Sequence, residues 1–184
     1  MSTTLSRRDF LRTGAAAGSG LILAIHLPGC APRSPREAGG PVETPFAPNA
    51  FLKVGTDGSV IVVVGYSEMG QGVLTAVPQL VAEELDVEWE RVRVEQAPAS
   101  DDYFNPMFGL QGTGGSSTVR SAWQPMREAG AKARAMLMSA AAAEWNVPST
   151  ECSTEPGFVV HSPSGRRRPY GELAAAAATI TVPE

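Results

Sequence analysis

Three glycines surround a small polar group in the stretch VVVGYSEMGQGVLT, which covers residues 62–75. Residues of these types at this spacing are compatible with three functions: a serine nucleophile on a tight turn, a cradle for a phosphate or cofactor, or a plain connection between a strand and a helix. A hydrolase nucleophile elbow requires the pattern G-x-S-x-G. Met69 occupies the position of the second glycine, and Gly70 comes one residue late. His161, the only histidine beyond the N-terminal segment, falls in an expected hairpin without an evident Asp partner, so the hydrolase interpretation is disfavoured.

A cofactor cradle fits the same residues better. Residues 70–72 (GQG) directly precede a helical pattern, where backbone N–H groups are unobstructed and the helix N-terminus carries partial positive charge. The amide of Gln71 can donate and accept at once, which suits the edge of a heterocycle. A second turn of this kind, QGTGGSST at 111–118, also precedes a helical pattern. The two turns converge if both helices pack on one sheet face; the alternative is two ordinary N-caps, with Ser116 or Ser117 serving the second. Composition and spacing do not separate these interpretations.

Hydrophobic periodicity predicts the elements that position the first turn. Two apolar runs, 51–54 and 60–64, flank the sequence GTDG, which is a hairpin signal. The second run is apolar on both faces, as expected of a central strand covered on both sides. Beyond Gly72, apolar residues recur at helical spacing as far as Leu85, and Pro78 inside that run predicts a kink or a late helix start.

The rest of the chain continues the pattern of strands and helices. Residues 91–95 alternate like a half-buried strand, 97–109 form a loop, and a helix runs from about 117 to 145. One broad face of that helix is expected to carry Trp123, Met126, Gly130, Ala133, Leu137, Ala141 and Trp145. A second hairpin is predicted around 158–165, and a helix opens at Tyr170. The predicted fold class is α+β: a mixed sheet with helices packed on it, incomplete because no final core element is evident.

Composition limits the classes of function. The 184 residues are 43% hydrophobic and 18% charged, with a net charge of −4. This mild acidity argues against a nucleic-acid-binding protein. The basic run 166–168 falls in an expected turn and is interpreted as a solvated loop. Cys30 and Cys152 are the only cysteines and cannot build a zinc or iron–sulfur site, so any metal is held by something other than thiolates.

The first 30 residues have the pattern of an export signal. The sequence SRRDFLR, at 6–12, precedes a run of small and apolar residues that is short for a membrane span of about 20 residues. Arg7 and Arg8 resemble the pair of the twin-arginine motif, which is read by machinery that exports folded proteins. We therefore expect a location in the periplasm or on the outer face of the inner membrane. Cys30 ends a sequence like a lipoprotein cleavage box, so lipidation, an uncleaved N-terminal membrane anchor and a later cleavage all remain open.

The composition then divides the chain into three parts. Residues 31–48 are rich in Pro, Gly, Arg and Glu and lack periodicity, which is typical of a linker. The expected organisation is an export signal over 1–30, a linker over 31–48 and a folded part over 49–184.

A family resemblance joins the two turns. The stretch EMGQGVLT, followed at family-like spacing by FNPMFGLQGTGGSSTVRSAW, resembles the molybdopterin-binding subunit of the xanthine dehydrogenase and aldehyde oxidase superfamily. Within it, the chain resembles the large (beta) subunit of the isoquinoline 1-oxidoreductase type, a branch that also carries a twin-arginine leader. The resemblance runs from Asn49 to the end of the chain and includes the tail RRRPYGELAAAA.

The resemblance implies specific cofactor contacts, which we expect of the N-terminal part of a molybdopterin-binding domain. The pterin of the molybdenum cofactor would meet the first turn at Met69, Gly70, Gln71 and Gly72. The pterin or its phosphate would meet the second turn at Thr113, Gly114, Gly115 and Ser116. In the family the catalytic base is a glutamate near the end of a much longer chain. Glu68 is therefore not that base, and no catalytic residue or metal ligand is assigned within residues 1–184.

The implied function is the N-terminal portion of a molybdenum hydroxylase or aldehyde oxidoreductase catalytic subunit. Its substrate would be an N-heterocycle or an aldehyde, its cofactor molybdenum–molybdopterin in the cytosine dinucleotide form, and its partner a small subunit with [2Fe-2S] clusters. These residues alone are expected to be inactive. The alternative is a truncated, non-catalytic exported α+β module that binds no cofactor, and no residue of the chain separates the two.

Overall fold

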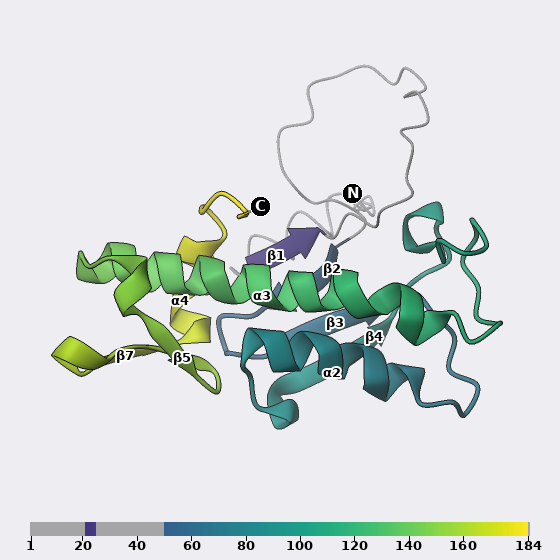
Figure 1. The fold of residues 1–184 in the computed structure, drawn as a ribbon, viewed down its shortest axis with the longest axis horizontal. Helices are drawn as coiled ribbons and strands as arrows, with labels where there is room; N and C mark the ends of the chain where they lie inside the picture. Colours follow the sequence, from purple (N-terminus) through teal and green to yellow (C-terminus); the bar gives the residue numbers. More distant parts are fainter. Residues whose placement is uncertain (1–20, 25–49, 184) are drawn as a thin grey trace, which may run out of the picture.

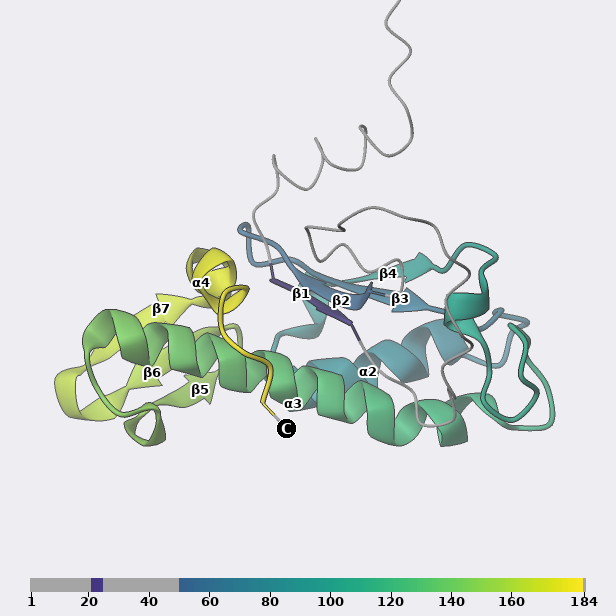
Figure 2. The same cartoon turned by 90° about the horizontal axis from the view of Figure 1, so that it is seen from above.

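The computed structural model describes residues 21–24 and 50–183, and Figure 1 shows their arrangement. Arg7, Arg8 and Cys30, on which the expected export and lipidation signals depend, lie outside the described residues. In the described part, a four-stranded sheet carries helices on one face, and a small three-stranded sheet lies near the end of the longest helix (Figures 1 and 2). The predicted α+β class is confirmed.

The larger sheet is mixed in direction. Its strands are β1 (Leu21–Ala24), β2 (Ala50–Val54), β3 (Val60–Val64) and β4 (Val92–Gln96), in the order β1-β2-β3-β4. The pairs β1–β2 and β2–β3 are antiparallel, whereas β3 and β4 are parallel. The first predicted hairpin is thus confirmed. Strand β1 comes from the run of small and apolar residues that was interpreted as part of the export signal.

Two helices lie on one face of this sheet (Figure 2). Helix α2 (Val73–Leu85) connects β3 to β4, and α3 (Thr118–Trp145) packs along it. Pro78 lies inside α2 and does not delay its start, because α2 begins directly after the glycine turn. The helices pack tightly at Gly130, where a Cβ atom would lie only 2.6 Å from the carbonyl oxygen of Val81.

The core lies between the sheet and these two helices. Val60, Val62 and Val64 of β3 are fully buried, whereas Ile61 and Val63, which alternate with them, are only half-buried. The second face of this strand is therefore buried less deeply than the first, and the expectation that the strand is covered on both sides stays a prediction. Residues of α2 and α3 form one core cluster with Val60, Val62 and Val64.

Helix α3 follows its predicted bounds, with one error on its apolar face. Trp123 was expected there, but it is 51% exposed, because it lies at the outer margin of the contact between α2 and α3. The guanidinium of Arg127 lies 5.2 Å from the centre of its ring. The other residues predicted for this face are buried: Met126, Gly130, Ala133, Leu137, Ala141 and Trp145.

The small sheet holds the second predicted hairpin. It consists of β5 (Ser153–Glu155), β6 (Phe158–His161) and β7 (Arg166–Pro169), all antiparallel, and α4 (Tyr170–Ala177) follows. Strand β5 was not predicted, because its residues are all polar. Short 3-10 turns occupy Trp89–Arg91, Asp101–Tyr103, Ser149–Glu151 and Ser162–Ser164.

The basic run 166–168 lies in β7 and not in a solvated loop. Arg166 donates to the carbonyl oxygen of Trp145 at the end of α3 (2.9 Å). Arg167 and Arg168 pair with carboxylates, namely those of Glu155, Glu144 and Glu172. The side chains of Arg166 and Arg168 therefore bind the small sheet to α3 and α4 through these hydrogen bonds and ion pairs.

Candidate functional site: two glycine turns

The two predicted turns lie at the same end of the helix pair. We define the first turn as residues 67–72, ahead of α2, and the second turn as residues 112–117, ahead of α3. Both helices begin at the right of Figure 1 and run in the same direction. The backbone N–H of Ser67 donates to Oγ1 of Thr113 at 2.8 Å. The structure therefore brings the two turns together across 46 residues of sequence.

The carboxylate of Glu68 caps the first turn and the start of α2. Its Oε1 accepts the N–H groups of Gly70 (2.8 Å) and Gly72 (2.9 Å), and its Oε2 accepts that of Leu74 (3.0 Å). These bonds, the one from Leu74 first, lower the pKa of Glu68 because they stabilise the charged form. The expectation that the GQG backbone offers unobstructed donors is wrong for both glycines, since Glu68 already occupies them.

The side chain of Gln71 is also engaged within the first turn. Its Oε1 accepts the N–H of Met69 at 2.5 Å, and its Nε2 donates to the carbonyl oxygen of Ser67 at 2.9 Å. The outer side of the turn is nevertheless open. Gly70 and Gly72 adopt φ values of 91° and 80°, and among the described residues no atom beyond the adjoining ones lies within 4 Å of a Cβ built on either. The first turn thus presents open space, with the exposed Met69 side chain beside it.

The second turn is built differently. Ser117 occupies the N-cap position of α3, but its hydroxyl donates to the carbonyl oxygen of Gly114 (2.7 Å) and caps no helix N–H. Gly115 and Ser116 are both left-handed, with φ values of 56° and 51°. For a serine this conformation costs roughly 1–2 kcal/mol, and such strain concentrates at ligand sites and switches. Within the described part of the chain, no acceptor meets the backbone N–H groups of residues 113–116.

Exposed apolar side chains belong to the first turn and to the loop before the second turn. Met69 of the first turn and three residues of the loop before the second turn, Met107, Phe108 and Leu110, are 45–69% exposed. Phe108 lies 3.6 Å from the position of a Cβ on Gly115. A few convergent polar groups within apolar surroundings are typical of cofactor sites. The N-terminus of α3 adds partial positive charge, so the arrangement suits a planar ligand that carries an anionic group.

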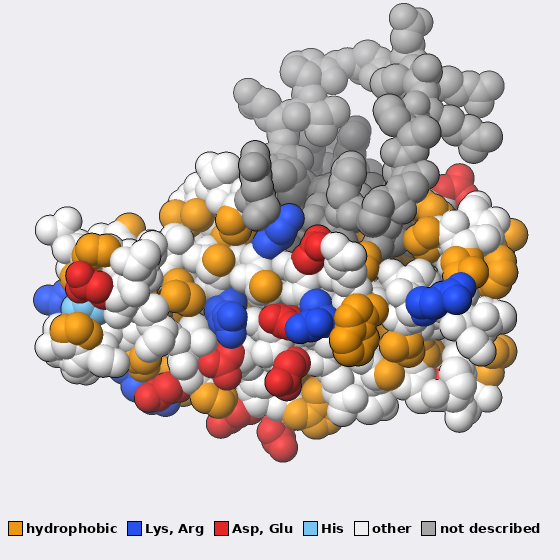
Figure 3. Space-filling view, in the orientation of Figure 1, with side chains coloured by type: hydrophobic (Ala, Val, Ile, Leu, Met, Phe, Trp, Pro, Cys, Tyr) orange, Lys and Arg blue, Asp and Glu red, His pale blue; other side chains and the backbone are white. Residues whose placement is uncertain are grey.

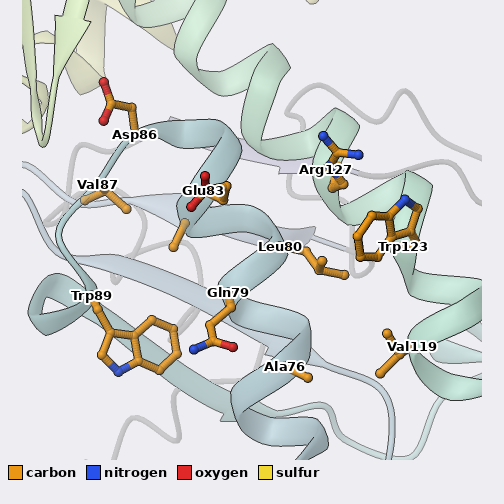
Figure 4. Close-up of a pocket in the computed structure, with 11 residues that line it drawn as sticks. Ala76, Gln79, Leu80, Glu83, Asp86, Val87, Trp89, Val119, Trp123 and Arg127 are labelled. Carbon is orange, nitrogen blue, oxygen red and sulfur yellow. The ribbon is translucent and has the colours of Figure 1, made fainter.

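A separate hollow lies between the outer faces of α2 and α3 (Figure 4). It measures about 780 Å³, and Leu80, Trp89 and Trp123 line it together with Arg127. Figure 3 shows acidic, basic and apolar side chains close together on this side of the molecule. The residues of the two glycine turns do not line this hollow, so it is distinct from the predicted site.

Residues 21–24 and 50–183 contain neither a cluster of metal ligands nor a helix fit to cross a membrane. No three His, Cys, Asp or Glu side chains in this part gather where they could hold a metal ion. In the same part of the chain, no helix combines the length and the apolar character that a membrane crossing requires.

His161 has partners that the sequence did not reveal. Its Nδ1 lies 2.7 Å from Oγ of Ser164, and its Nε2 lies 3.1 Å from Oε2 of Glu151. All three residues belong to the small sheet and its adjoining turns, near the end of α3, whereas Ser67 lies at the start of α2 (Figure 1). The structure therefore does not place a histidine beside Ser67, and the nucleophile interpretation of the first turn gains no support.

Comparisons with known proteins define the family to which this chain belongs. A family model described as the molybdopterin cofactor-binding domain matches residues 5–183. The chain belongs to this family. The resemblance inferred from the spacing of the two turns is thereby confirmed.

Individual relatives narrow the class. The chain is 46% identical over 140 residues to the isoquinoline 1-oxidoreductase subunit beta of Brevundimonas diminuta, which covers 75% of this chain and 18% of that protein. It is 29% identical over 173 residues to the membrane-bound aldehyde dehydrogenase [pyrroloquinoline-quinone] of Gluconacetobacter polyoxogenes, covering 94% of this chain and 21% of the relative. This chain therefore spans about a fifth of the length of these relatives.

A solved structure supports the fold. Quinoline 2-oxidoreductase from Pseudomonas putida 86 superposes with a TM-score of 0.54 at 20% identity, over 70% of this chain and 16% of that one. At this level of identity the similarity shows a shared fold.

Proposed function

We propose that this chain forms the N-terminal portion of the catalytic subunit of a molybdenum-dependent oxidoreductase, and that its two glycine turns together hold the pterin cofactor. The observation that carries the proposal is the junction of the turns through Ser67 and Thr113, beside the N–H donors of residues 113–116 ahead of α3, which have no acceptor in the described structure. Family membership and the resemblance to isoquinoline 1-oxidoreductase subunit beta support it.

The second turn supplies the hydrogen bonds in this proposal. The backbone N–H groups of Thr113, Gly114, Gly115 and Ser116 would meet the pterin or its phosphate, since they have no acceptor among the described residues. These donors are backbone groups at a helix N-terminus, which is a favourable setting for an anion.

The first turn supplies an open wall. Gly70 and Gly72 leave space for the ring system, and Met69 lies beside that space. Gln71 would contact the pterin by exchanging one of its bonds within the turn for one to the ligand. Glu68 remains the cap of α2 and takes no part in proton transfer.

The bound molybdenum cofactor would supply the redox chemistry, and the residues of this chain would bind and orient it. The general base and the substrate pocket are expected in the remaining four-fifths of a subunit of the relatives' length. The isolated 184 residues would therefore show no turnover.

Finer features belong to the same proposal. The similarity to an isoquinoline oxidoreductase and to an aldehyde dehydrogenase supports an N-heterocycle or an aldehyde as substrate. The isoquinoline 1-oxidoreductase relative is a subunit beta, which supports a partner subunit, and we propose that this partner is a small [2Fe-2S] protein. We propose the cytosine dinucleotide form of the cofactor. Arg7 and Arg8 support export by the twin-arginine machinery to the periplasm or the outer face of the inner membrane, with Cys30 as a candidate lipid site. The corresponding parts are a signal over 1–30, a linker over 31–48 and the domain over 49–184.

Cofactor analysis of the purified subunit tests the proposal. Molybdenum and an extractable pterin should co-purify with the chain. A quinone in place of the pterin would favour pyrroloquinoline quinone, the cofactor in the name of the aldehyde dehydrogenase from Gluconacetobacter polyoxogenes. A folded chain with neither group would favour the alternative, a non-catalytic module.

A further inference from the structure

Asn105 is a fully buried polar residue in the loop that leads to the second turn. Its backbone organises this loop. The N–H of Asn105 donates to the carbonyl oxygen of Leu110 (2.8 Å), and its own carbonyl accepts the N–H groups of Phe108 (3.0 Å) and Gly109 (2.9 Å). Buried amides are retained only where their hydrogen bonds are satisfied, so its side chain must have partners.

The Asn105 side chain bonds to both ends of the second turn. Its Nδ2 donates to Oγ of Ser117 (2.7 Å) and to the carbonyl oxygen of Gly112 (3.3 Å). Its Oδ1 accepts the N–H of Met107 (3.0 Å). Since Ser117 accepts from Asn105, its hydroxyl proton is free to point to the carbonyl oxygen of Gly114, which lies 2.7 Å away.

This network determines where the free donors point. The carbonyl oxygens of Gly112 and Gly114 are both held on the protein side, the first by Asn105 and the second by Ser117. The described chain contains no cis peptide bond. In a trans peptide the C=O and the following N–H point in opposite directions. The N–H groups of Thr113 and Gly115 are therefore directed away from Asn105, toward the outside of the turn.

We propose that Asn105 is a positioning residue for the cofactor: it aims the N–H donors of Thr113 and Gly115 at the ligand by holding the carbonyl groups behind them. The inference rests on the proposed function of the two turns. The network also accounts for the left-handed conformation of Ser116, because strained backbone persists only where its surroundings impose it.

The role requires an amide at this position. Asn105→Asp keeps the size and shape of the side chain and still accepts from Met107. It supplies at most one donor, and only when protonated, so at neutral pH both Gly112 and Ser117 lose their donor. The Ser117 hydroxyl would then turn to the carboxylate, and the carbonyl group of Gly114 would keep only its bond from the backbone N–H of Ser117 (3.1 Å).

The test compares three variants of the full chain, purified as the loaded protein. Asn105→Asp should lower the molybdenum content at least about tenfold, as loss of an orienting group does at metal sites. Ser117→Ala should lower it less, because the bond from Asn105 to Gly112 remains. The double variant should lose little more than Asn105→Asp, because both act through one network. Val159→Ala, in the buried interior of the small sheet, serves as the control of reduced stability.

The outcomes separate the inference from the proposed function. Loss of molybdenum in Asn105→Asp, with retention in a Val159→Ala variant of equal or lower Tm, supports the inference. Equal molybdenum content in wild type and Asn105→Asp overturns it and leaves the proposed function intact. Equal loss in Val159→Ala also overturns it, since general stability would then explain the effect. A wild-type protein without molybdenum overturns both.

Discussion

The two glycine turns have similar compositions but opposite constructions. The first turn is closed by its own side chains: Glu68 accepts three backbone N–H groups, and Gln71 bonds to the turn twice. The second turn leaves four consecutive N–H groups without an acceptor in the described structure and is held from behind by Asn105. In the first turn the backbone N–H groups of Gly70 and Gly72 are already hydrogen-bonded, whereas in the second turn the N–H groups of residues 113–116 are available to a ligand.

The difference shows that glycine serves separate purposes in the two turns. Gly70 and Gly72 allow left-handed backbone that wraps around the Glu68 carboxylate. In the second turn, the fixed carbonyl groups of Gly112 and Gly114 leave the N–H groups facing outward. The first turn therefore provides shape, and the second provides hydrogen bonds. The following predictions test this division.

The largest effect should come from separating the two helices that bring the turns together. Gly130→Ala places a Cβ 2.6 Å from the Val81 carbonyl oxygen and 3.1 Å from the Leu85 nitrogen. Because both contacts are backbone, α2 and α3 must move apart, and we expect a loss of about 1–3 kcal/mol of stability despite the higher helix propensity of alanine. Thermal denaturation measures this loss. The exposed Glu128→Ala on the same helix is the control, and an unchanged Tm for Gly130→Ala would contradict the packing.

The cap of the first turn should give a pH-dependent effect. Glu68→Gln should lower Tm at pH 7, because the carboxylate that accepts three N–H groups is lost. The folded-state pKa of Glu68 is lowered, so its contribution is fully present above the ordinary value of 4.5 and disappears as the pH falls through the lowered value. The difference in Tm from wild type should therefore shrink in acid. Glu95→Gln, at an exposed position of β4, is the control variant measured over the same pH range; a difference for Glu68→Gln that is constant with pH would argue against the cap.

The link between the turns should matter for the cofactor more than for stability. Thr113→Val removes the acceptor of the Ser67 N–H, an exposed bond worth at most about 1 kcal/mol. Molybdenum content should nevertheless fall several-fold, since the second turn is no longer held against the first. Metal analysis beside a Tm measurement checks this, with exposed Thr75→Val on α2 as the control. Full molybdenum content in Thr113→Val would mean that the turns act independently.

The smallest change in stability is expected for Gln71→Ala. The two bonds lost lie within an exposed turn, so Tm should hardly move. If Gln71 contacts the pterin, molybdenum content should still fall, whereas Gln79→Ala on the exposed side of α2 should leave it unchanged. Unchanged metal loading in Gln71→Ala would assign this residue to the turn alone.

Local patterns were sufficient to predict much of the fold. The GTDG hairpin, the helix after Gly72 and the helix from 118 to 145 follow from periodicity and turn residues, and the structure contains all three. The convergence of the turns also followed, given helices on one sheet face. Strand β5 could not be predicted because Ser153–Glu155 has no apolar alternation, and its pairing depends on β6.

The internal hydrogen bonds of the site were beyond sequence reasoning. Glu68 can cap its own turn only because the backbone between Glu68 and Leu74, six positions later, brings the N–H of Leu74 to its carboxylate. The role of Asn105 depends on contacts that are closed by a loop of up to 12 residues. The dipeptide Asn105-Pro106 signals a turn, but it does not show which groups the amide will meet. Trp123 was misplaced because an apolar side chain at helical spacing can also lie at the margin of a contact.

The most direct test of the central claim is the molybdenum and pterin content of the complete subunit, measured in wild type and in a variant that combines Gln71→Ala with Thr113→Val. The two turns together hold the cofactor if wild type carries molybdenum and pterin and the combined variant, still folded, has lost most of both. Equal content in the two proteins would contradict the claim that the two turns act together on the cofactor.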